Sequence, residues 1–241
     1  MTNFFKGFAL AVSMLTIIPF FKVHDFFKGI NGYAVMSYPL IGFLLGLILY
    51  STHTILTPYF TSLHLGIIIF TLWIVLTGAL HLDGFSDTID GLFVNKQRSL
   101  EVMKDPNTGG MGMIFTVTFL ILKASTLASF EAFYLLPIVL MLSRLSTVLA
   151  IYNYPYISKN GMGTLAKEEL TKIQTVVTVS YSLILAFLFS SFLLFVLSLI
   201  TLYFIKSFFI RRYGGFTGDI YGFNIELTEL ILLNTILLGL Y

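Results

Sequence analysis

Three aspartates in the run HLDGFSDTIDG, residues 81–91, have the spacing of a metal-binding stripe. Asp83, Asp87 and Asp90 are spaced i, i+4 and i+7, so on a helix they would lie within about 60° of one another. Three carboxylates this close repel one another, and a divalent cation relieves the repulsion. Oxygen-only ligands favour Mg²⁺ or Mn²⁺, whose open positions are commonly filled by substrate phosphates. The alternative is a solvated helix end, and we interpret His81 as an interfacial histidine.

A glycine-rich segment, KDPNTGGMG at residues 104–112, precedes an apolar run. Glycines before a helix N-terminus let backbone N–H groups approach a phosphate, and the helix dipole favours the anion. Gly109 and Gly110 are therefore candidates for phosphate binding. Asp105 and Asn107 are candidates for contacts with a metal, a ribose or a hydroxyl group. The alternative is an ordinary Pro-Asn-Gly turn.

A second glycine-rich segment, GGFTGD at residues 214–219, also leads into an apolar run. Asp219 and Glu226 are seven residues apart and would share a helix face if the helix began early. Acidic residues at the start of an apolar helix favour metal or cation binding over lipid contact. The alternative is that Asp219 only caps the helix dipole.

Two cations lie inside apolar segments. An arginine within a membrane faces the bundle interior, so we expect a phosphate or a carboxylate as the partner of Arg144. Lys123 either pairs with an acid or extends its ammonium group to the membrane surface.

The composition places this chemistry in a membrane. Of 241 residues, 57% are hydrophobic and 11% are charged, against about 25% charged residues in soluble domains. The net charge of +2 argues against a nucleic-acid partner. The absence of cysteine excludes disulfides, thiolate metal ligands and a cysteine nucleophile.

Apolar runs predict the membrane crossings. The clear ones are Tyr33–Leu56, Leu63–Leu80, Gly112–Phe130, Ala132–Ile151 and Asn224–Leu240. The uncharged run Ile173–Ile205 is too long for one crossing, so we divide it near Ser190–Ser191. Residues Gly7–Phe21 form a short apolar segment that either crosses the membrane or lies in its interface. We predict one all-α domain, residues 1–241: an integral membrane bundle of about seven helices plus a short N-terminal helix.

Eleven of the 14 basic residues fall on alternate connections, which predicts that these connections are cytoplasmic. The long polar stretches, 81–111, 152–172 and 206–223, lie on the same side, where we expect non-helical active-site loops. The acidic residues cluster at one edge of the membrane, and the sequence has no visible internal repeat. Both features favour an enzyme over a transporter, whose site would lie near the membrane midplane. Carboxylate-bound Mg²⁺, glycine-rich helix starts and an arginine would suit a pyrophosphate.

The chain resembles the cobalamin synthase (adenosylcobinamide-GDP ribazoletransferase) family. The matching elements occur in order and cover most of the chain: SYPLIG (37–42), HLDGFSDTIDG (81–91), the segment 103–112, Ser143-Arg144, and GFTGD (215–219) continuing to Glu226. The resemblance implies a Mg²⁺-dependent enzyme of the prokaryotic cytoplasmic (inner) membrane. It would join adenosylcobinamide-GDP to α-ribazole or its 5′-phosphate, giving adenosylcobalamin or its phosphate plus GMP.

The resemblance also implies roles for residues. The ribazole 3′-hydroxyl would attack the cobinamide-linked phosphorus, and the stripe of aspartates would hold Mg²⁺ on the pyrophosphate. Arg144 and the Gly109–Gly110 loop would contact phosphate, and Asp219 with Glu226 would complete a metal or hydroxyl site. Thr217, in the same T-G-D motif, is a further substrate-binding candidate. The motif does not specify which aspartate is the base, and an oligomer remains open.

The alternative enzyme family is the CDP-alcohol phosphatidyltransferases of phospholipid synthesis. The run Asp87-Thr-Ile-Asp90-Gly91 matches the start of their D-x-x-D-G signature. The rest departs from it, because Asn95 and Lys96 follow where Ala-Arg is expected and no G-x-x-x-D-x-x-x-D appears downstream. A cation-coupled transporter is the remaining alternative.

Overall fold

The chain folds into a bundle of α-helices. A computed structural model describes residues 3–18, 28–158 and 162–240. In chain order the helices are α1 (Asn3–Leu15), α2 (Asn31–Leu56), α3 (Ser62–Thr77), α4 (Leu80–Leu92), α5 (Lys96–Val102), α6 (Gly110–Ala128), the 3-10 turn η1 (Phe133–Leu135), α7 (Leu136–Asn153), α8 (Met162–Glu169), α9 (Lys172–Leu188), α10 (Phe192–Tyr213) and α11 (Gly218–Leu237). Within these ranges no strand forms, which confirms the predicted all-α class.

Within the described residues, five helical segments are each long and apolar enough to cross a membrane: α2, α6, η1 with α7, α10 and α11. Two further pairs, α3 with α4 and α8 with α9, pass the same test jointly but are bent by 85° and 96°. Counting each bent pair as one crossing gives up to seven, in agreement with the sequence. The chain is therefore a multi-pass membrane protein.

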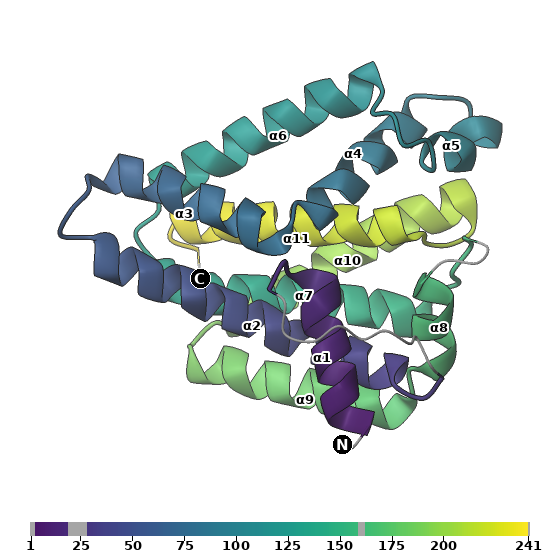
Figure 1. The fold of residues 1–241 in the computed structure, drawn as a ribbon, viewed down its shortest axis with the longest axis horizontal. Helices are drawn as coiled ribbons and strands as arrows, with labels where there is room; N and C mark the ends of the chain where they lie inside the picture. The colour runs from purple at the N-terminus through teal and green to yellow at the C-terminus, as the bar shows by residue number, and fades with distance from the viewer. Residues whose placement is uncertain (1–2, 19–27, 159–161, 241) are drawn as a thin grey trace.

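The connections alternate between the two ends of the bundle (Figure 1). The α4–α5 and α10–α11 connections and helix α8 lie together at the right of the view, while the α2–α3 and α9–α10 turns lie at the left. Helix α1 crosses α2 and has 13 residues, which is about 20 Å of helix and too short for a hydrocarbon core of about 30 Å. Residues 19–21 of the predicted N-terminal segment lie outside the described residues.

The predicted boundary near Ser190–Ser191 is confirmed. Helix α9 ends at Leu188 and α10 begins at Phe192, and Ser190 has a positive φ of 54° that turns the chain between them. The division of the long apolar run therefore coincides with a local change of backbone conformation.

Two other predicted segments end or begin at different residues in the structure. The helix of the predicted span Leu63–Leu80 ends three residues early, because Gly78 and Ala79 take left-handed conformations (φ 59° and 56°) and end α3 at Thr77. Helix α11 begins at Gly218, six residues before the apolar run Asn224–Leu240, which is the early start that a shared helix face for Asp219 and Glu226 requires. The Thr217 hydroxyl caps it by accepting a hydrogen bond from the Ile220 N–H at 3.2 Å. The polar stretches 81–111 and 152–172 are more helical than expected, because they contain α5 and α8 in addition to α4, the helix expected for the aspartate stripe.

Helix α7 lies at the centre of the bundle, and 89% of the apolar stretch within Phe133–Asn153 is buried inside the protein. Helix α2 approaches it closely through Gly42 and Gly46, four residues apart on one face. A Cβ atom at Gly42 would collide with the Leu140 carbonyl, and one at Gly46 would collide with Pro137. Small residues at this spacing let two membrane helices pack backbone to backbone.

Four charged side chains form an ion-pair network inside the bundle. Lys123 of α6 donates to Glu226 at 2.7 Å and to Glu229 at 2.6 Å, both on α11, and Arg144 of α7 pairs with Glu229. All four are buried, and the Lys123 ammonium also lies 4.3 Å from the centroid of the Trp73 ring. Two positive and two negative charges cancel, so the network ties α6, α7 and α11 together without leaving net charge in the interior.

The network predicts a large loss of stability when one carboxylate is removed. We expect Glu229→Gln to lower the free energy of unfolding by about 3–5 kcal/mol, because Lys123 and Arg144 then share one buried carboxylate. Thermal unfolding of the purified protein in detergent measures this change. Glu131→Gln makes the same chemical change at an exposed position and should shift stability by less than about 0.5 kcal/mol. Equal unfolding temperatures for the two variants would contradict a stabilising role for the network.

Candidate active site

The aspartate stripe lies on helix α4, as its spacing predicts. Along this helix Asp83 is exposed, Asp87 is half-buried and Asp90 is buried. Helix α4 packs directly on the first turns of α11, because Gly84 allows the Asp219 backbone to come close. A Cβ atom at Gly84 would lie 3.0 Å from the Asp219 Cα. This close crossing places the acid of the second glycine-rich segment beside the stripe.

The structure brings together the four aspartates that the sequence marks as catalytic candidates. Asp87 lies within electrostatic range of the carboxylates of Asp83, Asp219 and Asp90. Asp83 and Asp219 also line one cavity. Residues more than 100 positions apart in the sequence thus meet at one place, although their individual roles stay predictions.

The buried member of the stripe has a partner within the protein. The Gly109 N–H donates to Asp90 Oδ2 and the Gly112 N–H donates to Asp90 Oδ1, each at 2.7 Å. The glycines permit this approach, since a Cβ atom at Gly112 would collide with the Asp90 carboxylate and lie 2.8 Å from Ser86 Oγ. The anion at the N-terminus of α6 in this structure is therefore an internal carboxylate. Gly110, by contrast, has open space where a Cβ would lie.

The loop before α6 holds the next two candidates at the surface. Asp105 and Asn107 are both exposed. The backbone N–H and the side-chain amide of Asn107 donate to Asp105 Oδ1 at 2.9 and 2.8 Å. These two hydrogen bonds lower the pKa of Asp105, so its carboxylate stays ionised at neutral pH. The pair forms a local turn, and its contacts with a substrate stay a prediction.

Thr217 orients the acid at the start of α11. Its hydroxyl caps the helix and also lies 3.3 Å from Asp219 Oδ2, to which it donates. Gly218, between the two, has open space around it. The capping that starts α11 early therefore also positions the Asp219 carboxylate.

A cavity of about 240 Å³ lies between these acids and the bundle core. Residues from α1, α2, α4, α7, α8 and α11 line it: Met14, Leu15, Tyr38, Leu80, His81, Asp83, Gly84, Thr147, Ile151, Gly163, Ala166, Gly218, Asp219, Tyr221, Gly222 and Ile225. Two lining residues, His81 and Tyr221, each bury a polar atom that has no hydrogen-bond partner among the described residues, Nε2 and the hydroxyl oxygen respectively. Buried polar atoms are almost always hydrogen-bonded, so this pair suits a bound ligand.

Two predicted site residues, Arg144 and Glu226, belong to the ion-pair network and not to the cavity lining. Of the two partners expected for Arg144, the structure shows a carboxylate, that of Glu229. The Nε and Nη2 atoms of Arg144 have no partner among the described residues, so a phosphate contact stays a prediction. Lys123 pairs with acids, which is one of its two expected alternatives.

Sequence reasoning missed three residues at or near the site. Glu229 lies one turn after Glu226 in an apolar helix. Two acids and two cations within apolar segments could have predicted that these four side chains form ion pairs. His81 was assigned to the membrane interface, but it is buried and lines the cavity. Tyr221 carried no sequence signal, because its importance depends on which helices surround it.

The carboxylate oxygens of Asp83, Asp87, Asp90 and Asp219 are the donor type that a hard cation such as Mg²⁺ prefers, but their positions do not form a complete metal site. Among the described residues, no three His, Asp or Glu side chains are arranged so that they could hold a metal ion. Mg²⁺ commonly uses only one or two carboxylates and takes its other ligands from water and substrate phosphates. The donor types therefore fit Mg²⁺ only as a partner of a bound phosphate.

Comparison with known proteins gives a consistent result. The family model described as cobalamin-5-phosphate synthase matches residues 7–237. An adenosylcobinamide-GDP ribazoletransferase of Pseudomonas aeruginosa PAO1 is 38% identical over 209 residues, covering 82% of this chain and 84% of the relative. The enzyme of that name from Acinetobacter baumannii ACICU is 32% identical, and the match covers 97% of this chain and 98% of the relative. The one from Desulforamulus reducens is 37% identical, and the match covers 98% of this chain and 97% of the relative.

No solved structure matches the chain. The family match covers nearly the whole chain, and it includes every candidate site residue. The chain is therefore a membrane enzyme of the cobalamin-5-phosphate synthase family.

Proposed function

We propose that this enzyme joins adenosylcobinamide-GDP to α-ribazole or α-ribazole 5′-phosphate. The products are adenosylcobalamin or its 5′-phosphate and GMP, formed at the cytosolic face of the cytoplasmic membrane. The relatives' names and the family match support the substrates. The observation that carries the site assignment is that Asp83 and Asp219 line one cavity together with two buried polar atoms that have no partner among the described residues.

The reaction needs an activated hydroxyl and a neutralised leaving group. The ribazole 3′-oxygen forms a bond to the phosphorus attached to cobinamide. The bond from that phosphorus to the oxygen bridging to GMP breaks, and GMP leaves with the electron pair. A carboxylate takes the hydroxyl proton. Positioning and charge neutralisation provide most of the catalysis in such phosphoryl transfers.

Each acid has a distinct environment that suits one part of this chemistry. Asp90 is engaged by two backbone N–H groups, so we assign it to positioning the loop before α6. Among the described residues no donor reaches the Asp83 or Asp87 carboxylate, and the Thr217 hydroxyl donates to one oxygen of Asp219, so we assign these three acids to Mg²⁺ or to the hydroxyl proton. When bound, Mg²⁺ would neutralise charge on the pyrophosphate oxygens. Gly110, with open space beside it, leaves room for a phosphate near the start of α6.

The cavity is the proposed place for part of a substrate. At about 240 Å³ it is too small for a whole corrinoid, so the larger substrate would extend outside. Its lining is apolar apart from the two acids, Thr147 and the polar atoms of its aromatic side chains. Tyr221 stacks between Phe216 and Tyr156, with centroid distances of 5.5 and 6.0 Å, which gives the cavity a rigid aromatic wall. Neither the phosphatidyltransferase nor the transporter alternative is favoured by any of these observations.

The proposal is tested directly by measuring GMP release. The purified protein in lipid vesicles is mixed with adenosylcobinamide-GDP, α-ribazole and Mg²⁺, and GMP and cobalamin are followed by mass spectrometry. We expect equimolar formation of the two products. EDTA should stop the reaction and added Mg²⁺ should restore it, because the carboxylates alone leave the pyrophosphate charge uncompensated. Turnover of CDP-diacylglycerol with an alcohol, and none of adenosylcobinamide-GDP, would refute the proposal.

Removal of one carboxylate at the centre of the cluster should abolish most activity. Asp87→Asn keeps the size of the side chain but removes the charge, and we expect GMP release to fall by about a hundredfold or more. Glu101→Gln, an exposed change on α5, is the matched control and should retain activity. Wild-type turnover by Asp87→Asn would remove this residue from the reaction.

The hydrogen bonds from Gly109 and Gly112 to Asp90 hold the loop before α6 in place, so displacing this loop should lower activity. Gly112→Ala places a methyl group against the Asp90 carboxylate, so the loop must shift and GMP release should fall by about tenfold to a hundredfold. Thr108→Ala changes an exposed residue of the same loop and serves as the control. If both variants retained the wild-type rate while staying folded, the position of this loop would not matter for the reaction.

A further inference from the structure

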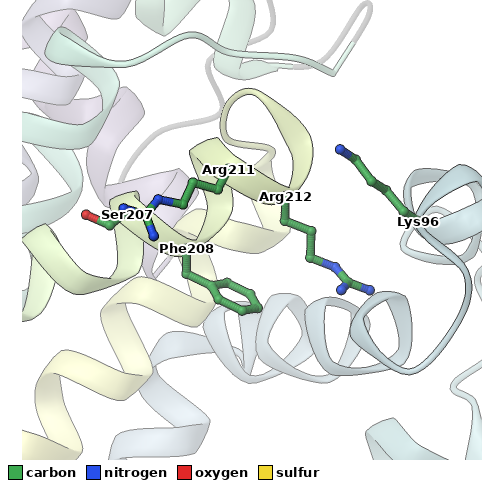
Figure 2. Close-up of a pocket in the computed structure, with 5 residues that line it drawn as sticks. All are labelled: Lys96, Ser207, Phe208, Arg211 and Arg212. Carbon is green, nitrogen blue, oxygen red and sulfur yellow. The ribbon is translucent and has the colours of Figure 1, made fainter.

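A second cavity lies outside the proposed active site, at the C-terminal end of α10. Its volume is about 470 Å³, and it is lined by Lys96, Ser207, Phe208, Arg211 and Arg212. Figure 2 shows Lys96 approaching from the start of α5 while the two arginines come from the last turn of α10. Three of the five lining residues are cationic, and no lining residue is acidic.

One wall of this cavity is fixed by hydrogen bonds to α4. The Arg212 guanidinium donates to the carbonyl oxygens of Leu92 at 3.0 Å and Val94 at 3.3 Å, and to the Tyr213 hydroxyl at 2.9 Å. The Tyr213 hydroxyl in turn donates to the Gly91 carbonyl at 3.2 Å. Arg212 is therefore a structural residue that joins the end of α10 to the helix that carries the aspartate stripe.

The other two cations have no such partner. Within the part of the chain that the structure describes, neither the Lys96 nor the Arg211 side chain makes a hydrogen bond or an ion pair. Arginines in the last turn of a helix interact favourably with the negative end of the helix dipole, which explains why Arg211 and Arg212 lie at the end of α10. This interaction does not account for Lys96, which begins another helix and points toward the same cavity (Figure 2). Lys96 and Arg211 thus line one hollow from two different helices, with no acid in its lining, and this arrangement suits an anion.

The surroundings of the cavity indicate where that anion comes from. Phe208 lines it and is 50% exposed, and the preceding turn of α10 exposes Tyr203 and Phe204 by 59% and 67%. Large apolar side chains exposed on a membrane-spanning helix face lipid. An adjoining cavity of about 370 Å³ shares Arg211 and adds Lys206 and Tyr154. A cationic hollow that opens onto a lipid-facing helix is arranged for a charged headgroup with its acyl chains beside it.

We propose that Lys96 and Arg211 bind the phosphate of an anionic phospholipid, with Phe208 against the adjoining glycerol and acyl carbons. The phosphate occupies the cationic cavity, and the acyl chains lie along the exposed face of α10. The cationic cavity has no lining residue in common with the cavity of the proposed active site. Lipid binding is thus separable from the transferase reaction.

Native mass spectrometry of the intact protein in detergent tests the proposal. Phosphatidylglycerol is added stepwise, and phosphatidylcholine is added in a parallel series. We expect a saturable phosphatidylglycerol adduct that phosphatidylcholine does not match. The double variant K96Q/R211Q should bind phosphatidylglycerol about tenfold more weakly, because each cation near a membrane surface contributes appreciably to anionic lipid binding. The charge-conserving variant K96R/R211K should retain the adduct.

The control removes the same charge elsewhere. Arg98 and Lys172 are exposed and do not line either cavity, so R98Q/K172Q should bind the lipid like the wild type. Equal weakening in both double variants would show general surface attraction and would overturn the proposal. If glycerol phosphate, which lacks acyl chains, displaced the lipid at equal concentration, the cavity would take a soluble anion and the lipid assignment would be wrong. If K96Q/R211Q did not fold, R211Q alone would be measured against R98Q with the same criteria.

Discussion

The fold depends on neutralising four charges that lie inside an apolar bundle. Lys123, Arg144, Glu226 and Glu229 come from three helices and are all buried. Each charge alone would be very costly in a membrane interior, but the arrangement sums to zero and uses close contacts. The helices that carry these residues cannot slide or rotate independently without separating charges. Helix α11 is fixed in this way, and it is the helix on which α4 packs.

The second constraint is the close contact of α4 with α11 and with the start of α6. Gly84 admits the backbone of Asp219, and Gly112 admits the carboxylate of Asp90. A carboxylate from one helix thereby accepts hydrogen bonds from two backbone N–H groups at the N-terminus of another, where the helix dipole favours an anion. This internal anion holds the loop before α6 next to the remaining aspartates. The cluster of acids is thus a product of glycine positions as much as of the acids themselves.

Much of this arrangement was predictable from the sequence. The spacing of Asp83, Asp87 and Asp90 required a helix to bring them onto one face, and α4 supplies it. The long run without charge required a break near Ser190, because membrane thickness limits a crossing. The family resemblance rested on motifs spread over most of the chain, and the family match over residues 7–237 confirms it.

Other features could not be derived from local patterns. The left-handed conformation of Ala79 has no local signal, since alanine has no preference for it. It lies between α3, which packs on α6 and α2, and α4, which packs on α11 and α6. The engagement of Asp90 by Gly109 and Gly112 joins elements about twenty residues apart, and either a metal or a backbone amide could satisfy the same carboxylate. The burial of His81 followed from where α11 lies. Each of these required knowledge of the neighbouring helix.

The 85° bend at Gly78–Ala79 also solves a problem of length. A straight helix from Ser62 to Leu92 would extend about 45 Å, well beyond a hydrocarbon thickness of about 30 Å. Its polar end would project into water, far from any neighbour. The bend turns α4 away from the axis of α3, so that the extra length runs across the end of the bundle and does not extend beyond it. An amphiphilic molecule that rests in the headgroup layer can then meet ionised side chains without leaving the membrane.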